Sequence, residues 1–192
     1  MSWNNFNNAE DQTNFDIIPK GTFAKVRMTI KPGGYNNEQK GWTHGYATQN
    51  TASGAVFLNA EFVVLEGPYA RRKIWSLIGL HSEKGEEWSN IGRSLIKAIL
   101  NSARGIGNKD NSPTAQSARC INSLSDLDGI EFIARIDIEK DQYDNDRNVI
   151  KYAITNDHKE YAALMGRVGH AIPVATPSPQ PQRIAGNLPS WA

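Results

Sequence analysis

Residues 54–80 read Gly-Ala-Val-Phe-Leu-Asn-Ala-Glu-Phe-Val-Val-Leu-Glu (54–66), Gly-Pro-Tyr-Ala-Arg-Arg-Lys (67–73) and Ile-Trp-Ser-Leu-Ile-Gly-Leu (74–80), and they decide the fold. Two runs rich in Val, Ile, Phe and Trp flank a Gly-Pro dipeptide, which is typical of a β-hairpin. Side chains alternate between the two faces of a strand. The alternation predicts one apolar face, made of Val56, Leu58, Ala60, Phe62 and Val64 on the first strand and Ile74, Ile78 and Leu80 on the second.

The opposite face of this hairpin mixes aromatic and charged side chains. It is predicted to hold Phe57, Asn59 and Glu61 on the first strand and Lys73, Trp75 and His81 on the second, with Tyr69, Arg71 and Arg72 in the turn. A surface that stacks bases and neutralises phosphates needs this mixture of rings and cations. The alternative is an ordinary hairpin with Trp75 in a second apolar layer, since aromatic side chains mostly serve cores.

A lead strand is predicted over residues 21–31, where the alternation is equally clear. Its inward side chains are Thr22, Ala24, Val26, Met28 and Ile30, and its solvent side is predicted to hold Phe23, Lys25, Arg27, Thr29 and Lys31. This solvent side is basic with one aromatic ring. It suits a polyanion, and it also suits an ordinary solvated strand.

Residues 32–53 are predicted to form a long loop, rich in Gly and containing Tyr35, Trp42 and Tyr46. Loops of this length inside a compact domain tend to be functional or disordered. Two interpretations stay open: a binding loop that closes over a flexible ligand, and a loop that packs back on the sheet.

The second half of the chain predicts helices first and then another hairpin. An amphipathic helix is predicted to open at Glu86-Glu87 and to end just before Gly105, with Trp88, Ile91, Leu95, Ala98, Ile99 and Ser102 on its core face. Ser112-Pro113 predicts the start of a second helix that reaches about Leu124. Strands over 130–138 and 148–154 flank the acidic loop 141–146, and Ile150, Tyr152 and Ile154 alternate along one face of the second strand. A short helical turn follows at 157–165.

The order of these elements predicts a mainly β fold with helices. Residues 17–165 are expected to form a five-stranded OB-like barrel, with the amphipathic helix between strands three and four. Residues 1–16 are interpreted as a flexible arm and 166–192 as a disordered, Pro-rich tail. The apolar tip of this tail (Leu188, Pro189, Trp191) is predicted to dock a replication or recombination protein, or else to have no partner.

Charge is segregated along the chain although the net charge is only +1. Residues 17–60 and 91–124 each hold five basic residues and one acid, whereas 125–160 hold ten acids and five basic residues. A basic surface and an acidic surface are therefore expected on one domain, and the basic one favours a polyanion partner.

Composition and motifs argue against several other classes of protein. No run approaches the ~18 apolar residues of a membrane span, so a cytoplasmic protein is expected. The single cysteine, Cys120, excludes an internal disulfide and a multi-cysteine zinc site, and it is expected to be buried in a helix. No cofactor, metal or catalytic motif is predicted. A metal-dependent nuclease or resolvase that uses the acidic segment 137–146 stays open as an alternative.

The motifs resemble a family of phage and prophage genomes that is catalogued as a domain of unknown function. The matching residues are 18–23 (Ile-Pro-Lys-Gly-Thr-Phe), 62–69 (Phe-Val-Val-Leu-Glu-Gly-Pro-Tyr) and 72–75 (Arg-Lys-Ile-Trp), with weaker echoes in 91–100 and 127–130. The resemblance covers about 17–155. Members often sit near replication and recombination genes, and the resemblance implies a single-stranded-DNA-binding protein of OB-like fold.

The leading prediction is therefore a non-enzymatic protein that coats or protects single-stranded DNA in the cytoplasm of a phage-infected or lysogenic bacterium. A structural or adaptor protein is the rival, and a homo-oligomer stays open. The residues expected to contact DNA are Phe23, Lys25, Arg27, Lys31, Trp42, Tyr46, Tyr69, Arg71, Arg72, Lys73 and Trp75.

Overall fold

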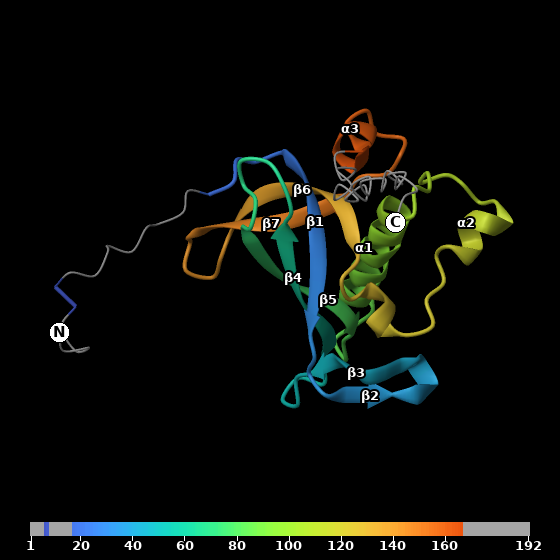
Figure 1. The fold of residues 1–192 in the computed structure, drawn as a ribbon. Helices are drawn as coiled ribbons and strands as arrows, with labels where there is room; N and C mark the ends of the chain where they lie inside the picture. The colour runs from blue at the N-terminus through green and yellow to red at the C-terminus, as the bar shows by residue number, and fades with distance from the viewer. Residues whose placement is uncertain (1–5, 8–16, 167–192) are drawn as a thin grey trace, which may run out of the picture.

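The computed structural model describes residues 6–7 and 17–166 (Figure 1). Its strands are β1 (Thr22–Lys31), β2 (Tyr35–Asn37), β3 (Trp42–Gln49), β4 (Val56–Val64), β5 (Lys73–His81), β6 (Glu131–Lys140) and β7 (Asp146–Ala153). Its helices are α1 (Glu87–Ala103), α2 (Pro113–Ser117) and α3 (Tyr161–Met165), with short 3-10 turns η1 (Glu38–Lys40) and η2 (Leu124–Leu127). Apart from residues 6, 7 and 166, the predicted arm and tail lie outside the described residues.

The strands form one curled antiparallel sheet, in effect a half-barrel. Its order is β2-β3-β4-β1-β6-β7, and β5 pairs with the other edge of β4. Val56 and Phe57 at the start of β4 pair with β3, and residues 59–64 pair with β1 along the same edge. In Figure 1 the β2–β3 hairpin lies at one end of the sheet, α3 at the other, and α1 beside it.

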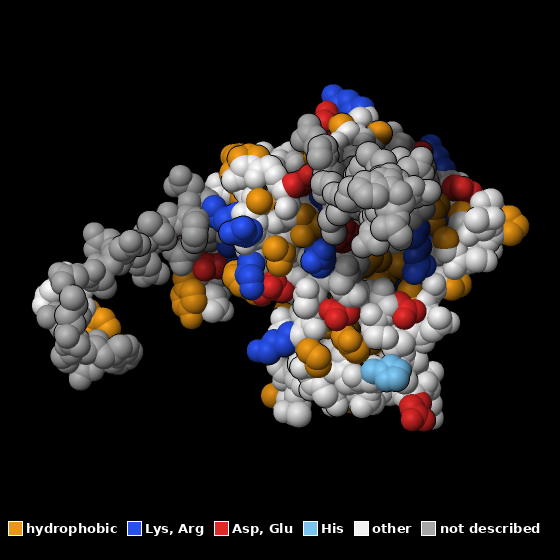
Figure 2. Space-filling model, viewed as in Figure 1, with side chains coloured by type: hydrophobic (Ala, Val, Ile, Leu, Met, Phe, Trp, Pro, Cys, Tyr) orange, Lys and Arg blue, Asp and Glu red, His pale blue; other side chains and the backbone are white. Residues whose placement is uncertain are grey.

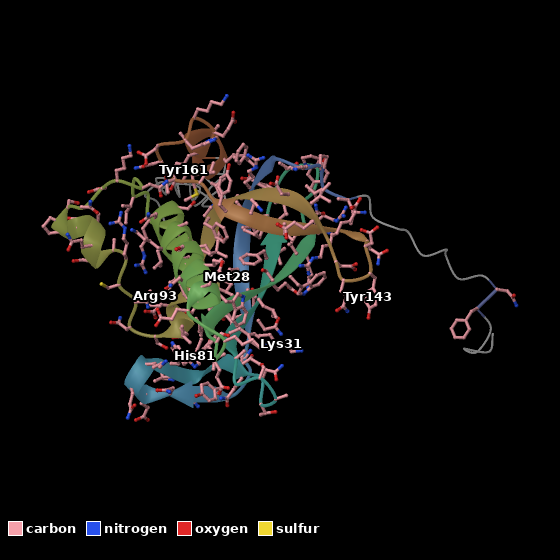
Figure 3. All side chains as sticks on the ribbon, turned by 180° about the vertical axis from the view of Figure 1, so that it is seen from behind. Met28, Lys31, His81, Arg93, Tyr143 and Tyr161 are labelled. Carbon is pink, nitrogen blue, oxygen red and sulfur yellow. The ribbon has the colours of Figure 1, made fainter. Side chains whose placement is uncertain are left out.

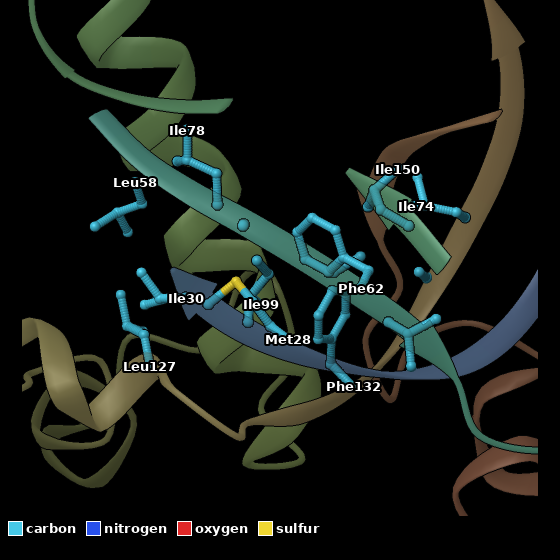
Figure 4. Packing of buried hydrophobic residues seen from close by; sticks show 14 of the residues in the cluster. Met28, Ile30, Leu58, Phe62, Ile74, Ile78, Ile99, Leu127, Phe132 and Ile150 are labelled. Carbon is cyan, nitrogen blue, oxygen red and sulfur yellow. The ribbon is translucent and has the colours of Figure 1, made fainter. Parts of the chain in front are cut away.

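The concave side of the sheet encloses the apolar core. Every inward residue predicted for β4 is buried to 1% exposure or less, and Ile74 and Ile78 of β5 are buried with them, which confirms the predicted hairpin. Phe62 of β4 meets Phe132 of β6 edge to face, with ring centroids 5.9 Å apart. Figure 4 shows this pair beside Met28 of β1 and Ile99 of α1, so side chains from distant parts of the sequence fill one core.

Helix α1 packs closely on β5 because two glycines meet there. A Cβ on Gly92 would lie 1.9 Å from the carbonyl oxygen of Gly79, and a Cβ on Gly79 would lie 2.5 Å from the Trp88 ring. The helix ends as predicted, since Gly105 adopts the left-handed conformation (φ +64°) just after it. The prediction for Ile91 is wrong, because this residue was expected on the core face and is 60% exposed.

The predicted loop 32–53 is wrong, because most of it folds as the β2–β3 hairpin. Tyr35 pairs with Ala47, and Asn37 pairs with Trp42 across η1. The described residues therefore form seven strands, not five. His44 and Gly45 both have positive φ (63° and 68°), which interrupts the alternation by which a strand is recognised.

Three smaller predictions are also corrected. Helix α2 ends at Ser117 and does not reach Leu124. Cys120 is exposed, because it follows the end of α2 in an irregular segment. Tyr152 is 40% exposed, because a register shift between Arg135 and Ile136 changes which β7 side chains face the core.

No helix in residues 17–166 is both long enough and apolar enough to cross a membrane.

Candidate nucleic-acid interface

The convex side of β1, β4 and β5 forms the surface predicted to bind DNA, called here the outer sheet face. Pairing aligns its side chains in three rows across the strands. The rows are Arg27–Val63–Lys73, Thr29–Glu61–Trp75 and Lys31–Asn59–Leu77.

Trp75 lies in the middle row and is 59% exposed. Its Nε1 donates a hydrogen bond of 3.1 Å to Oε2 of Glu61, the residue directly opposite on β4. The other carboxylate oxygen of Glu61 lies 3.0 Å from Nζ of Lys73. One carboxylate therefore orients an exposed indole ring and a neighbouring cation, and Leu77, 53% exposed, continues the apolar surface.

The cations of β1 are less available to phosphate groups than predicted. Lys25 was expected on the solvent side, but it is 5% exposed and forms a 3.0 Å ion pair with Glu131 of β6. Arg27 donates to the same carboxylate from Nη2 (2.5 Å) and Nε (3.1 Å). Of the outer-face cations on β1, only Lys31 makes no ion pair with a described residue.

The contacts with Arg27 and Lys25 lower the pKa of Glu131. Partial burial acts to raise the pKa, but the hydrogen bonds and charges of Arg27 and Lys25 outweigh it and hold the pKa below the ordinary value of 4.5. In Figure 2, red side chains lie next to blue ones over the strands of the sheet.

Phe23, predicted to stack a base, has a different neighbourhood. It packs against Ile133, Ile154 and Tyr161, and its ring centroid lies 4.8 Å from that of His158. The segment that contains α3 thus covers this end of the convex side. The ring is half-buried, so little of it remains for a base.

The turn between β4 and β5 places Tyr69, Arg71 and Arg72 beside the Lys73 end of the outer sheet face. Arg71 is exposed and adopts a positive φ of 68°, which a hydrogen bond from its N–H to the Val64 carbonyl helps to fix. Tyr69 and Arg72 are half-buried, and Tyr69 packs against the main core.

Trp42 and Tyr46 lie apart from the outer sheet face. Both are half-buried and pack against the core from β3. The ammonium of Lys40 lies 5.2 Å from the centre of the Trp42 ring, and Tyr35 lies 6.4 Å from it between ring centroids. Trp42 faces a different hollow, between the β2–β3 hairpin and α1.

That hollow, called here the basic cleft, has a volume of about 700 Å³. Four cations line it: Lys40, Arg93, Lys97 and Arg119. No Asp or Glu is among its lining residues in the described part of the chain. The excess of basic residues in 91–124 was the only sequence signal for it, because the cations come from three separate segments.

The acidic segment 137–146 has structural contacts throughout. Asp137 accepts from the Gly21 N–H at 2.8 Å, while Asp141 accepts from the N–H groups of Tyr143 and Asn145. Hydrogen bonds from the backbone N–H of Asn145, the largest contribution, and of Tyr143 hold the pKa of Asp141 below its usual value. Ion pairs join Glu139 to Lys151 and both Asp144 and Asp146 to Lys140.

Within residues 6–7 and 17–166, no group of three or more His, Cys, Asp or Glu side chains has the geometry to hold a metal ion. The predicted docking residues Leu188, Pro189 and Trp191 lie outside the described residues. Comparison of the sequence with models of protein families gave no match, and comparison with curated proteins gave none.

Proposed function

We propose that this protein binds single-stranded DNA on its outer sheet face and coats or protects it during replication or recombination of a phage or integrated element. The observation that carries the proposal is Trp75, a ring 59% exposed whose indole N–H is fixed by Glu61. An exposed Trp of fixed orientation stacks a base at a low cost in side-chain entropy.

The order of strand pairing supports the same function. Strand β1 pairs with β4 and β6, and the hairpins β4–β5 and β6–β7 lie before and after α1. This order is consistent with an OB-fold, in which the outer face of the second and third strands binds oligonucleotides. In that assignment β4 and β5 are strands two and three, α1 lies between strands three and four, and β2–β3 is an extra hairpin.

Phosphate binding on this face depends on a few cations. Lys31 is free of ion pairs among the described residues, while Lys73 and Arg27 would each exchange part of a carboxylate contact for a phosphate. Each phosphate neutralised on a single strand contributes about 0.7 to the slope of log K against log salt. Three contacts give a slope of about −2, a weak salt dependence for a DNA-binding protein.

The rival adaptor function has one observation in its favour. Leu77, 53% exposed, lies next to Trp75 on the same face of β5. An aliphatic side chain beside an aromatic one suits a protein partner as well as a base. The nuclease alternative has less support, since the carboxylates of 137–146 are engaged in turns and ion pairs.

Titration of the full chain with oligo-dT at several salt concentrations tests the proposal. Trp75→Ala should weaken binding by about 1–3 kcal/mol, the usual contribution of one stacked base. Tyr143→Ala is the matched control, because Tyr143 is 75% exposed on the acidic β6–β7 turn, where Asp144 and Asp146 repel phosphates.

The proposal fails if oligo-dT does not bind, if affinity is indifferent to salt, or if Trp75→Ala binds as the unchanged protein does. In the first case, loss of binding to a protein partner in Trp75→Ala and Leu77→Ala would establish the adaptor function.

A further inference from the structure

The basic cleft lies on the other side of α1 from the outer sheet face. Trp88 and Gly92 face β5, and Trp88 also meets Phe57 on the convex side of β4. Arg93 and Lys97 instead line the cleft. Figure 3 shows Arg93 on the side of α1 that is turned toward the segment containing α2. The outer sheet face and the basic cleft are therefore separate surfaces, and each could bind its own ligand.

Within the described residues, the cations of the cleft have no carboxylate partner. Neither Arg93 nor Lys97 forms an ion pair or a side-chain hydrogen bond there, in contrast to Lys25, Arg27 and Lys73 on the sheet. Their positive charge is thus available to a ligand in a concave site, where low-dielectric walls strengthen attraction of an anion.

Arg119 is held in place by neutral groups. Its Nε donates to Oδ1 of Asn101 at 2.7 Å and its Nη2 to the carbonyl of Gly107 at 3.1 Å. Asn101 is itself 1% exposed, so the guanidinium is anchored to a buried side chain. Asp110 is near enough for its charge to interact with Arg119, but it does not line the cleft. This arrangement orients a guanidinium without neutralising it.

Arg93 and Lys97 also stand four residues apart on one helix face. Like charges at this spacing destabilise a helix. Residues 89, 90, 94, 96, 100 and 101, which are their other neighbours at this spacing, include no acid that could compensate. The described fold gives this pair of cations no partner, and an anionic ligand would relieve their repulsion.

The remaining walls suit an organic ligand. Leu80, Ile96, Leu100, Ile121 and Leu124 provide apolar surface, and Trp42 with Lys40 closes one end. A volume of about 700 Å³ lies within the range of sites for small ligands. Apolar walls, one aromatic ring and several cations together match a base joined to phosphate groups.

We propose that the basic cleft binds a nucleotide, with Arg93, Lys97 and Arg119 contacting its phosphate groups and Trp42 near its base. The nucleotide is either free in solution or a unit of a single strand. This site goes beyond the outer sheet face and does not require that face to bind DNA.

Isothermal titration of the full chain with dTTP, and separately with oligo-dT, tests the proposal in four proteins. These are the unchanged chain, the double variant Arg93→Ala/Lys97→Ala, the control Lys159→Ala at an exposed cation next to α3, and Trp75→Ala. Arg93 and Lys97 are exposed helix residues, so alanine should leave the fold intact, which circular dichroism verifies. Trp75→Ala reports the outer sheet face separately.

A free-nucleotide site predicts that the double variant loses at least ten-fold in dTTP affinity, while Lys159→Ala and Trp75→Ala lose none. A strand site predicts no dTTP binding, but at least ten-fold weaker oligo-dT binding in the double variant and unchanged oligo-dT binding in Lys159→Ala. The inference is overturned if the double variant binds both ligands as the unchanged chain does, or if neither ligand binds. Loss of oligo-dT binding in Trp75→Ala concerns the outer sheet face only.

Discussion

The outer sheet face and the basic cleft use cations in opposite ways. On the sheet, Glu131 pairs with Lys25 and Arg27, and Glu61 pairs with Lys73, so cross-strand partners consume most of the charge. In the cleft, Arg93 and Lys97 have no such partner among the described residues. The number of lysines and arginines in a segment therefore says little about phosphate binding until their partners are known.

Breaking the ion pairs of Glu131 should cause a large loss of stability. Glu131→Gln leaves Lys25, 5% exposed, without its carboxylate, and should lower the free energy of unfolding by about 3 kcal/mol, the lower end for a broken buried pair. Glu61→Gln is the matched control: its partner Lys73 has a side chain 51% exposed, so the loss should be at most about 1 kcal/mol. Urea unfolding of the three proteins measures both, and equal losses would contradict the distinction between the pairs.

These pairs also explain what the sequence could not predict. Alternation correctly assigned the inward residues of β1 and β4, because it depends only on neighbours two positions apart. Whether Lys25 is free depends on Glu131, which β6 brings beside β1 from more than 100 positions away. Pairing register of this kind is set by the whole sheet and has no local signal.

The basic cleft could not be predicted from the sequence for the same reason. Lys40, Arg93 and Arg119 meet only after the β2–β3 hairpin and α1 are in place. The hairpin was itself missed, because Gly41, His44 and Gly45 have positive φ and break the alternation. By contrast, α1 has a continuous 3.6-residue period, and its position agrees with the prediction apart from the exposed Ile91.

The second prediction concerns pH. The pKa of Glu131 lies below its ordinary value of 4.5 in the folded protein, so its contribution is present above that value and is lost as pH falls through the lower, folded-state pKa. The stability difference between the unchanged chain and Glu131→Gln should therefore be full at pH 6 and shrink as the pH falls below about 4.5. Urea unfolding between pH 6 and pH 3 measures it, and a difference that stays constant would show that Glu131 is not the titrating group.

The third prediction concerns Lys73, whose cross-strand carboxylate can be removed so that the lysine becomes as free as the cations of the cleft. Glu61→Gln removes one negative charge and frees Lys73, while the glutamine carbonyl can still accept from the Trp75 indole. Oligo-dT should bind more tightly, with the slope of log K against log salt steeper by at most about 0.7, because Lys73 no longer shares its charge with a carboxylate. A titration series in salt measures this slope, with Glu139→Gln as the control because Glu139 pairs with Lys151, away from this face. An unchanged slope would mean that phosphates do not reach Lys73.

The smallest expected effect is a gain in stability from the cleft. Lys97→Gln removes one member of the like-charged pair with Arg93 at i and i+4, and glutamine has about the same helix propensity as lysine. The free energy of unfolding should therefore rise by about 0.2–0.5 kcal/mol.

The control is Lys84→Gln, an exposed substitution in the loop before α1, which should change the free energy of unfolding less. Urea unfolding in replicate at low ionic strength resolves the difference, and high salt should erase it, because screening removes a repulsion between exposed charges. A loss of stability in Lys97→Gln would instead mean that Lys97 serves the fold, and the case for a ligand in the cleft would then depend on Arg93 and Arg119.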